Sequence, residues 1–172
     1  PYSVDLRTFF SPIQDQESQK ACNAFSIVSV VEYFVHQIYH NNDNLSESFV
    51  YYNTRELANQ ENENVGTNVY NLISSLRDKG VCLEELCPFK PDVYDERPSE
   101  EAYADAESRK VTEAKNVALD LDVMRSALAQ GYPLLISARS FDAYVQDANG
   151  VIEPPPAEEL AEDKNKNHAM VI

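Results

Sequence analysis

The strongest hydrophobic pattern in the chain lies between residues 22 and 40 and predicts one long helix. Apolar residues recur there at intervals of three or four positions, which is the spacing of one face of an α-helix. They are Ala24, Ile27, Val28, Val31, Phe34, Val35 and Ile38. Phe25, Val30 and Tyr33 add apolar side chains outside this face. We therefore expect the helix to be buried on most of its sides.

Capping residues predict two more helices in the first half of the chain. Ser46 suits the N-cap of a helix that continues to Leu57, because its hydroxyl can accept a bond from an unpaired N–H group of the first turn. Asn68 can do the same for a helix over residues 69–79, and Gly80 follows as a left-handed C-terminal cap. The first half of the chain is thus expected to be mainly helical.

The second half predicts one helix and two strands. Asp120 or Asp122 can cap a short helix that ends at Gly131. Residues 132–138 form a mostly apolar run that predicts a strand, and residues 168–172 predict another.

Two polar stretches predict irregular connections. Residues 90–110 are rich in Pro, Glu and Asp and predict an acidic connection with one short surface helix. Asn149-Gly150 predicts a turn, and residues 154–166 predict a long loop before the last strand.

The composition restricts the partners of the protein. Its 172 residues, enough for one or two compact lobes, include 14 basic and 29 acidic side chains and carry a net charge of −15. This charge argues against nucleic acid and anionic membrane surfaces and favours cationic partners. Polar residues interrupt the apolar stretch 24–38, so no membrane span is expected. The chain begins at Pro1, and we expect it to be a processed or recombinant mature form without a signal peptide.

Cys22 is the first candidate for chemistry because it opens the long helix. A helix N-terminus carries a partial positive charge and unpaired N–H groups, which favour a thiolate nucleophile over a thiol. The side chain of Gln16, six residues upstream, can form an oxyanion hole together with the Cys22 backbone N–H. His168 opens the last strand about 150 residues later, and this chain order is that of papain-like peptidases.

Short motifs along nearly the whole chain resemble the papain (C1) family of cysteine peptidases. The first are Ser3-Val4-Asp5-Leu6-Arg7, Ser11-Pro12-Ile13-Gln14-Asp15-Gln16 and Cys22 to Ser26. The later ones are Leu45-Ser46-Glu47, Val65-Gly66-Thr67, Gly80 to Phe89, Arg97-Pro98-Ser99, Gly131 to Leu135 and Ser140-Phe141. Each motif is weak alone, but their order and spacing are specific together. The middle and late segments are most similar to bacterial-type members.

The resemblance implies an α+β fold of two lobes with an active-site cleft between them. It implies a helical lobe over residues 12–110, which carries Cys22, and a β-rich lobe of residues 1–11 and 111–172, which carries His168. The implied thiolate–imidazolium pair hydrolyses peptide bonds through an acyl-enzyme intermediate, as a thiol endopeptidase does.

The resemblance also implies how a substrate is bound. Gly66 would offer its backbone to the extended chain of a peptide. The main specificity pocket would be lined by Thr67, Asn68, Ser137 and Ala169.

Three residues near the nucleophile depart from the family pattern. Glu17, Gln19 and Asn23 stand where the family usually has a glycine, a disulfide cysteine and a tryptophan. One usual disulfide is therefore lost, and so is an aromatic side chain close to the site.

The end of the chain departs from the pattern as well. The family's third catalytic residue is an asparagine beyond the histidine, but only four residues follow His168. Asn165 and Asn167 lie too close to His168 in sequence to be assigned this role. We therefore expect residues beyond Ile172 to complete the sheet and to supply the asparagine.

Cys82 and Cys87 leave two interpretations open. They can bridge each other if the turn between them brings their Cα atoms within about 7 Å, or both can be reduced and packed. No metal site and no cofactor are expected, because the cysteines and histidines lack the paired spacing that zinc requires.

Two classes of function follow from these observations. The first is an active thiol endopeptidase, which we prefer because Gln16, Cys22 and His168 are all retained. The second is a catalytically degenerate papain-like module that binds proteins or peptides, as Glu17, Asn23 and the absent asparagine suggest. A polypeptide substrate, with a propeptide or a protein inhibitor, is the expected partner. The expected location is secreted, or another extracytoplasmic or lytic compartment.

Overall fold

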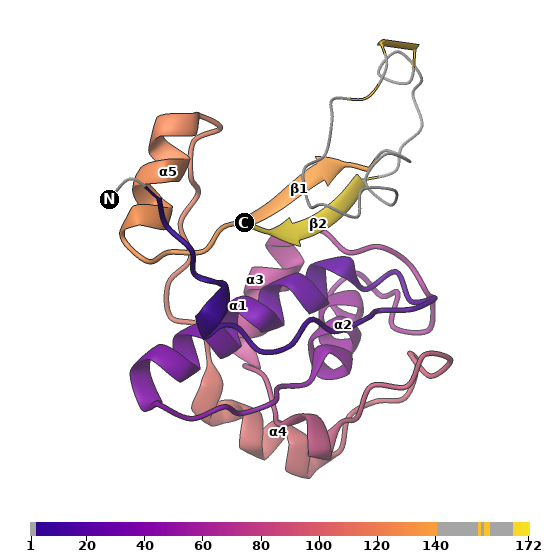
Figure 1. Cartoon of the computed structure of the whole chain (residues 1–172). Coiled ribbons are helices and arrows are strands. Elements are labelled where there is room, and N and C mark those ends of the chain that lie inside the picture. The colour runs from indigo at the N-terminus through magenta and orange to yellow at the C-terminus, as the bar shows by residue number, and fades with distance from the viewer. Residues whose placement is uncertain (1–2, 141–154, 156, 159–166) are drawn as a thin grey trace.

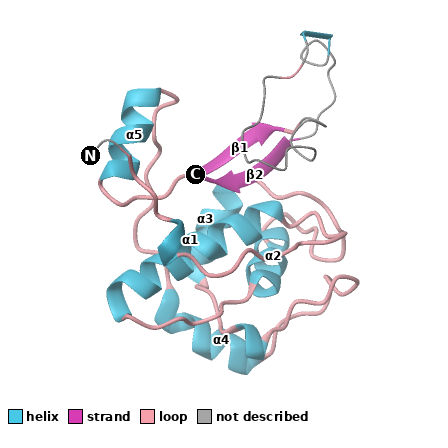
Figure 2. Cartoon of the chain, in the orientation of Figure 1, coloured by secondary structure: helices cyan, strands magenta, loops and turns pink. Residues whose placement is uncertain are grey.

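The computed structural model describes residues 3–140, 155, 157–158 and 167–172, and it combines α-helices with a two-stranded sheet (Figures 1 and 2). The helices within residues 3–140 are α1 (Cys22–Tyr39), α2 (Glu47–Glu56), α3 (Val69–Asp78), α4 (Glu100–Ala106) and α5 (Leu121–Ala129). The strands are β1 (Leu135–Arg139) and β2 (Asn167–Val171). Single 3-10 turns lie at Arg7–Phe9, Glu84–Leu86 and Glu107–Arg109. No helix in the described residues is long and apolar enough to cross a membrane.

Helix α1 lies at the centre of the core, as its apolar pattern predicts. Helices α2 and α3 and strand β2 all pack against it. Its buried residues include Val28 and also Val30, which lies outside the predicted face. The prediction of a helix that is buried on most sides is therefore confirmed. The helix ends at His40, which adopts a left-handed φ of 57°.

The predicted caps of α2 and α3 are confirmed. The Ser46 hydroxyl accepts a hydrogen bond from the Phe49 N–H at 3.0 Å, and the Asn68 side chain accepts one from the Asn71 N–H at 2.8 Å. Gly80 follows α3 with a left-handed φ of 76°. A Cβ atom at this position would lie 2.1 Å from the Ala106 carbonyl oxygen, so the glycine also allows α4 to approach closely.

Helix α4 differs from the expected surface helix. Its Ala102 and Ala106 side chains are fully buried and form a second core cluster with Phe49 and Cys82. The acidic composition of the surrounding segment gives no sign of these two buried alanines, whose small size lets α4 pack closely against Phe49 and Cys82.

Helix α5 and the sheet have fewer buried side chains. The Asp120 carboxylate caps α5 by accepting from the N–H groups of Asp122 and Val123 at 2.9 and 3.0 Å, which decides between the two predicted caps. No residue of α5 is buried.

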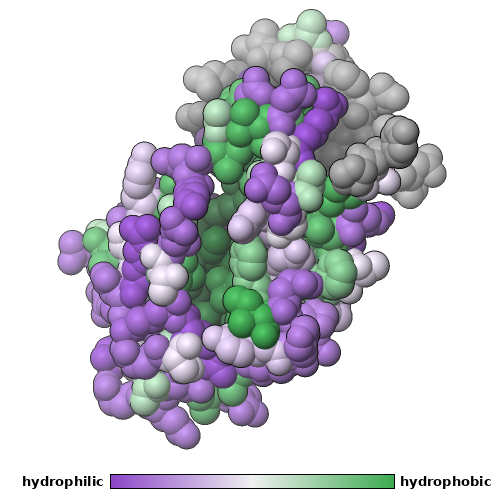
Figure 3. Space-filling view, turned by 90° about the vertical axis from the view of Figure 1, so that its left-hand side faces the viewer, coloured by the Kyte–Doolittle hydropathy of each residue, from purple (hydrophilic) through white to green (hydrophobic). Residues whose placement is uncertain are grey.

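The face of the molecule that carries α5 has apolar side chains at its surface and a central hollow with apolar residues on its floor (Figure 3).

The first strand begins three residues later than the apolar run predicts. The Tyr132 N–H closes the end of α5 by donating to the Ala127 carbonyl at 3.1 Å, and Pro133 has no N–H group to give to a strand partner. Strand β1 then pairs antiparallel with β2 from Leu135 onward.

Several sequence predictions are not tested by the described part of the chain. The turn at Asn149-Gly150 and most of the loop over residues 154–166 fall outside the described residues. The division into lobes at residues 12–110, 1–11 and 111–172 stays a prediction.

Candidate active site

Cys22 is the first residue of α1, and the helix start there has no side-chain cap. Ala21 occupies the N-cap position and offers no hydrogen bond from its side chain, and the first turn contains no acidic residue. The N–H groups of this turn are therefore free of a competing anion and can favour a negative charge beside them. Cys22 is half-buried, so the residue is not enclosed in the core.

The loop before Cys22 has an unusual backbone at Glu17. This residue adopts a left-handed φ of 47°, a conformation that glycine adopts far more readily. Its N–H group donates to the Asp15 carboxylate at 2.8 Å, which stabilises the turn. The position where the resemblance expects glycine thus keeps a glycine-like conformation. Gln16, just before it, is half-buried, and its Nε2 donates to the Gln19 carbonyl oxygen at 2.6 Å.

Asn64 fixes the same loop from outside, and sequence reasoning missed it. Its Oδ1 accepts from the Lys20 N–H at 2.8 Å and from the Tyr51 hydroxyl at 2.9 Å, and its Nδ2 donates to the Ser18 carbonyl at 3.2 Å. Burial raises the pKa of Tyr51, which keeps this hydroxyl protonated as a donor. An isolated Asn-Glu-Asn stretch gives no sequence signal for such a role.

Arg55 is a second residue that the sequence did not single out. It is 1% exposed and donates to the carbonyl oxygens of Glu61 and Glu63 at 2.7 and 2.6 Å, and to that of Tyr94. Burial lowers its pKa. Its guanidinium also stacks 3.8 Å from the centre of the Tyr51 ring. Arg55 therefore joins two loops to α2.

Asn23 connects the nucleophile helix to the predicted substrate-binding residues. Its Nδ2 donates to the Thr67 carbonyl at 2.5 Å and to the Thr67 hydroxyl at 3.3 Å. Gly66 is exposed, and a Cβ atom added there would meet nothing within 4 Å. Gly66, Thr67 and Asn68 all line a cavity of about 270 Å³. Three of the predicted substrate-binding residues therefore border one cavity, whose other lining residues belong to α2, to the loop after it and to α3.

His168 lies in β2 and is half-buried. Strand β2 packs against α1, and in Figure 1 both elements begin at the right of the view and run to the left. Cys22 and His168 therefore lie at the corresponding ends of these two elements.

The sheet register separates His168 from the other two predicted residues of this region. Ser137 pairs with Ala169, and Ala138 pairs with His168. Directly opposed residues of an antiparallel pair share a face, so Ser137 and Ala169 lie on one face and His168 on the other. Ser137 is exposed, whereas Ala169 is buried.

All three cysteines are free thiols in the structure. Of the two interpretations for Cys82 and Cys87, the structure has the reduced and packed one. Burial raises the pKa of Cys82 to about 12 and also raises that of Cys87. Neither thiol is therefore suited to act as a nucleophile at neutral pH.

Comparisons with known proteins identify the family and the fold of the chain. The model of the papain family of cysteine proteases matches residues 1–172. An uncharacterized peptidase C1-like protein of Acanthamoeba polyphaga mimivirus is 27% identical over 159 residues, which cover 84% of this chain and 50% of that protein. The chain therefore spans about half the length of this curated relative.

Two solved structures share the fold. Xylellain, a cysteine protease from Xylella fastidiosa, superposes with a TM-score of 0.82 at 25% identity, over 99% of this chain and 68% of that chain. Digestive procathepsin L 3 from the larval midgut of Tenebrio molitor superposes with a TM-score of 0.78 at 17% identity, over 100% of this chain and 55% of that chain. The predicted papain-like α+β fold is confirmed, and the bacterial resemblance rests on xylellain.

Proposed function

Since the chain belongs to the papain family of cysteine proteases, we propose that it hydrolyses peptide bonds, with Cys22 as the nucleophile and His168 as the acid and base. One observation carries this proposal. Cys22 begins α1 without a side-chain cap, and β2, which carries His168, packs against the same helix.

The proposed reaction starts from the thiolate of Cys22 and the imidazolium of His168. The thiolate attacks the carbonyl carbon of the substrate amide, and the carbonyl oxygen becomes an oxyanion. The Cys22 backbone N–H and the Gln16 side chain bind this oxyanion. His168 gives its proton to the leaving amine, and the acyl group remains on Cys22. His168 then takes a proton from water, whose oxygen attacks the thioester carbonyl carbon. The carbon–sulfur bond breaks, which releases the carboxylic acid product and restores the Cys22 thiolate and the His168 imidazolium.

The amide of Gln16 has a donor left for this role. A primary amide carries two N–H groups, and the one hydrogen bond given above for Nε2, to the Gln19 carbonyl, occupies one of them. The bond also holds the side chain in the loop that leads to Cys22.

The proposed substrate is an extended polypeptide that is cleaved internally. Its backbone would lie along the exposed Gly66, and one of its side chains would enter the adjoining cavity bordered by Thr67 and Asn68. The net charge of −15 favours cationic segments in a substrate, a propeptide or a protein inhibitor. Secretion, or another extracytoplasmic or lytic location, stays a prediction.

The binding module is the second candidate function, and Asn23 favours it. The polar side chain at this position is used to hold Thr67, where the family usually has an aromatic residue. A module of this kind would bind a peptide along Gly66 without cleaving it.

Hydrolysis of fluorogenic peptide amides separates the two candidates. We expect turnover by the wild-type protein and a loss of at least about 1,000-fold in Cys22→Ser, because the nucleophile is removed. Cys87→Ser is the matched control and should keep its activity. Peptide binding without turnover, at equal affinity in the wild type and in Cys22→Ser, would favour the binding module instead.

A further inference from the structure

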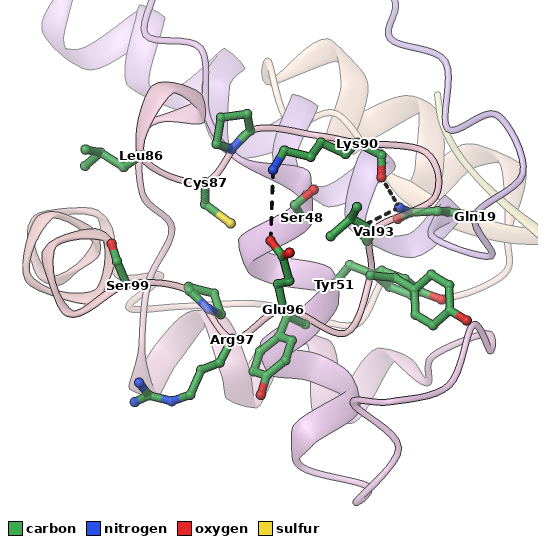
Figure 4. Close-up of a pocket in the computed structure, with 14 residues that line it drawn as sticks. Gln19, Ser48, Tyr51, Leu86, Cys87, Lys90, Val93, Glu96, Arg97 and Ser99 are labelled. Carbon is green, nitrogen blue, oxygen red and sulfur yellow. Dashed lines mark hydrogen bonds and ion pairs between the residues drawn. The ribbon is translucent and has the colours of Figure 1, made fainter.

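Gln19 is a buried amide in the loop before α1, and its side-chain hydrogen bonds go to residues more than 70 positions later in the sequence. It is 1% exposed, and its Nε2 donates to the carbonyl oxygen of Lys90 at 2.7 Å and to those of Pro91 and Val93 at 3.2 Å each. Figure 4 shows Gln19 at one side of a cavity of about 250 Å³, with its amide turned toward Lys90 and Val93.

The turn over residues 90–93 favours an amide side chain at position 19, because its carbonyl oxygens need hydrogen-bond donors. The Val93 N–H donates to the Lys90 carbonyl at 3.0 Å, and the turn directs three carbonyl oxygens at one point. An NH₂ group supplies two donors to these oxygens. A hydrocarbon side chain would remove the Gln19 donor from all three oxygens, and of these only the Lys90 oxygen has the Val93 N–H as a second donor, while a carboxylate would place further negative charge among them.

This turn is itself held firmly on both sides. Before it, the Phe89 N–H donates to Glu84 Oε1 at 2.6 Å, and the Phe89 ring packs edge-on against Phe25 of α1 with their centres 5.1 Å apart. After it, the buried Arg55 donates to the Tyr94 carbonyl. The Gln19 side chain is therefore bonded to a turn that is itself held by contacts on both sides.

The backbone of Gln19 is bonded to Gln16 at two points. The Gln19 N–H donates to the Gln16 carbonyl at 3.1 Å, and the Gln19 carbonyl accepts from Gln16 Nε2 at 2.6 Å. A displacement of Gln19 would therefore change both the backbone and the side chain of Gln16.

We propose that Gln19 is a positioning residue, which fixes the Gln16 amide in the oxyanion hole by bonding its loop to the carbonyl oxygens of residues 90–93. This inference rests on the proposed function, in which Gln16 binds the oxyanion. Because an oxyanion forms only in the transition state, loss of this positioning lowers kcat and leaves KM nearly unchanged.

The first test compares two Gln19 variants with a matched buried amide. Gln19→Leu removes the donor, and Gln19→Glu keeps the size of the side chain but replaces the NH₂ group by an oxygen. We expect kcat to fall by about 10 to 100-fold, less than the roughly 100 to 1,000-fold for complete loss of an oxyanion donor, with KM within about 3-fold. Asn53, which is fully buried in α2 and bonded to the Phe49 carbonyl, provides the control. An equal fall of kcat in Asn53→Leu would show a general effect of stability and would overturn the proposal.

A double-mutant cycle tests the route through Gln16. In a Gln16→Ala background, Gln19→Glu should lower kcat by less than about 3-fold, because the group that it positions is already absent. The same fold loss in both backgrounds would contradict the proposal.

An NMR measurement tests the positioning without any need for activity. In ¹⁵N-labelled protein, the side-chain N–H of Gln16 that is bonded to Gln19 should exchange slowly with solvent, and Gln19→Glu should remove this protection. The exposed side chain of Gln14 serves as the control and should not change. Unchanged Gln16 exchange would refute the positioning role. If the wild type cleaves no peptide but Gln16 loses its protection in the variant, the positioning role holds and the proposed function fails.

Discussion

The region of α1 to α4 and the region of α5, β1 and β2 are built in different ways. In the first, apolar and polar side chains are buried together, and Arg55, Asn53 and Gln19 are nearly or fully covered while bonded to backbone or side-chain partners. In the second, α5 buries no residue, and the apolar Leu119 and Leu121 are 98% and 67% exposed.

The two residues of the proposed catalytic pair lie in different regions. Cys22 stands on the densely packed region, where Asn64 and Gln19 fix the loop before it. His168 stands on the thin sheet, which touches the core through Leu135 and Val171. Well-packed elements open rarely and sparsely packed ones open often. We therefore expect the nucleophile side of the site to be rigid and the base side to be the more mobile.

Truncation of one leucine in each region should give the largest difference in the free energy of unfolding. Leu76 is fully buried in the main core, so Leu76→Ala should lower the free energy of unfolding by about 4 kcal/mol. Leu121→Ala is the matched change at an exposed site and should stay within about 0.5 kcal/mol. Urea unfolding of both variants measures the difference, and equal effects would mean that α5 is packed as well as α3.

Substitution of two glycines with a left-handed φ gives a second comparison, in which the expected loss of stability is smaller. Gly80→Ala combines an unfavourable φ of 76° with a Cβ atom 2.1 Å from the Ala106 carbonyl oxygen, and should cost about 3 kcal/mol. Gly131→Ala has a φ of 83°, but its Cβ atom would lie 3.5 Å from the Tyr33 hydroxyl. It should cost about 1 kcal/mol, from the φ alone. Thermal unfolding of both variants measures the two losses of stability. A larger loss in Gly131→Ala than in Gly80→Ala would contradict this prediction.

The buried carboxyl group of Glu47 in the first region predicts that stability depends on pH. Burial, with smaller contributions from the nearby carboxyl groups of Glu84 and Glu32, raises the pKa of Glu47 from 4.5 to about 8. The folded state therefore holds a proton that the unfolded state releases above its lower pKa, and stability falls as the pH rises from about 4.5 to 8. Glu47→Gln should remove this loss and stabilise the protein by about 3 kcal/mol at pH 7, with little effect at pH 4.

Glu85→Gln is the matched control for this measurement. Glu85 is exposed, so its removal should change stability by less than about 0.5 kcal/mol at either pH. A Glu47→Gln variant with the same stability as the wild type at pH 7 would show that burial does not control this carboxyl group.

The ends of several helices could be predicted from the sequence, because a capping side chain bonds to a backbone group only a few residues away. Ser46, Asn68 and Asp120 each cap a helix through an N–H two or three positions ahead, and Gly80 ends α3 in the expected conformation. The late start of β1 follows from Pro133 and was also open to sequence reasoning.

The contacts that hold the site could not be found in this way. Gln19 meets its partners 71 to 74 positions later in the chain, and Asn64 meets Lys20 44 positions earlier. Both bond mainly to backbone groups, which every residue has, so no residue type marks the partner. The burial of α4 depends likewise on where Phe49 and Cys82 lie in space.

Alkylation of the three cysteines as a function of pH tests the central claim, a reactive Cys22 paired with His168, most directly. Iodoacetamide should label Cys22 well below pH 7, because the helix start and an imidazolium both favour the thiolate. Cys82 and Cys87 should not react there, since burial raises the pKa of both. His168→Ala should move the labelling of Cys22 to alkaline pH. Labelling of Cys22 only above about pH 8, or unchanged labelling at pH 5 in His168→Ala, would contradict the account.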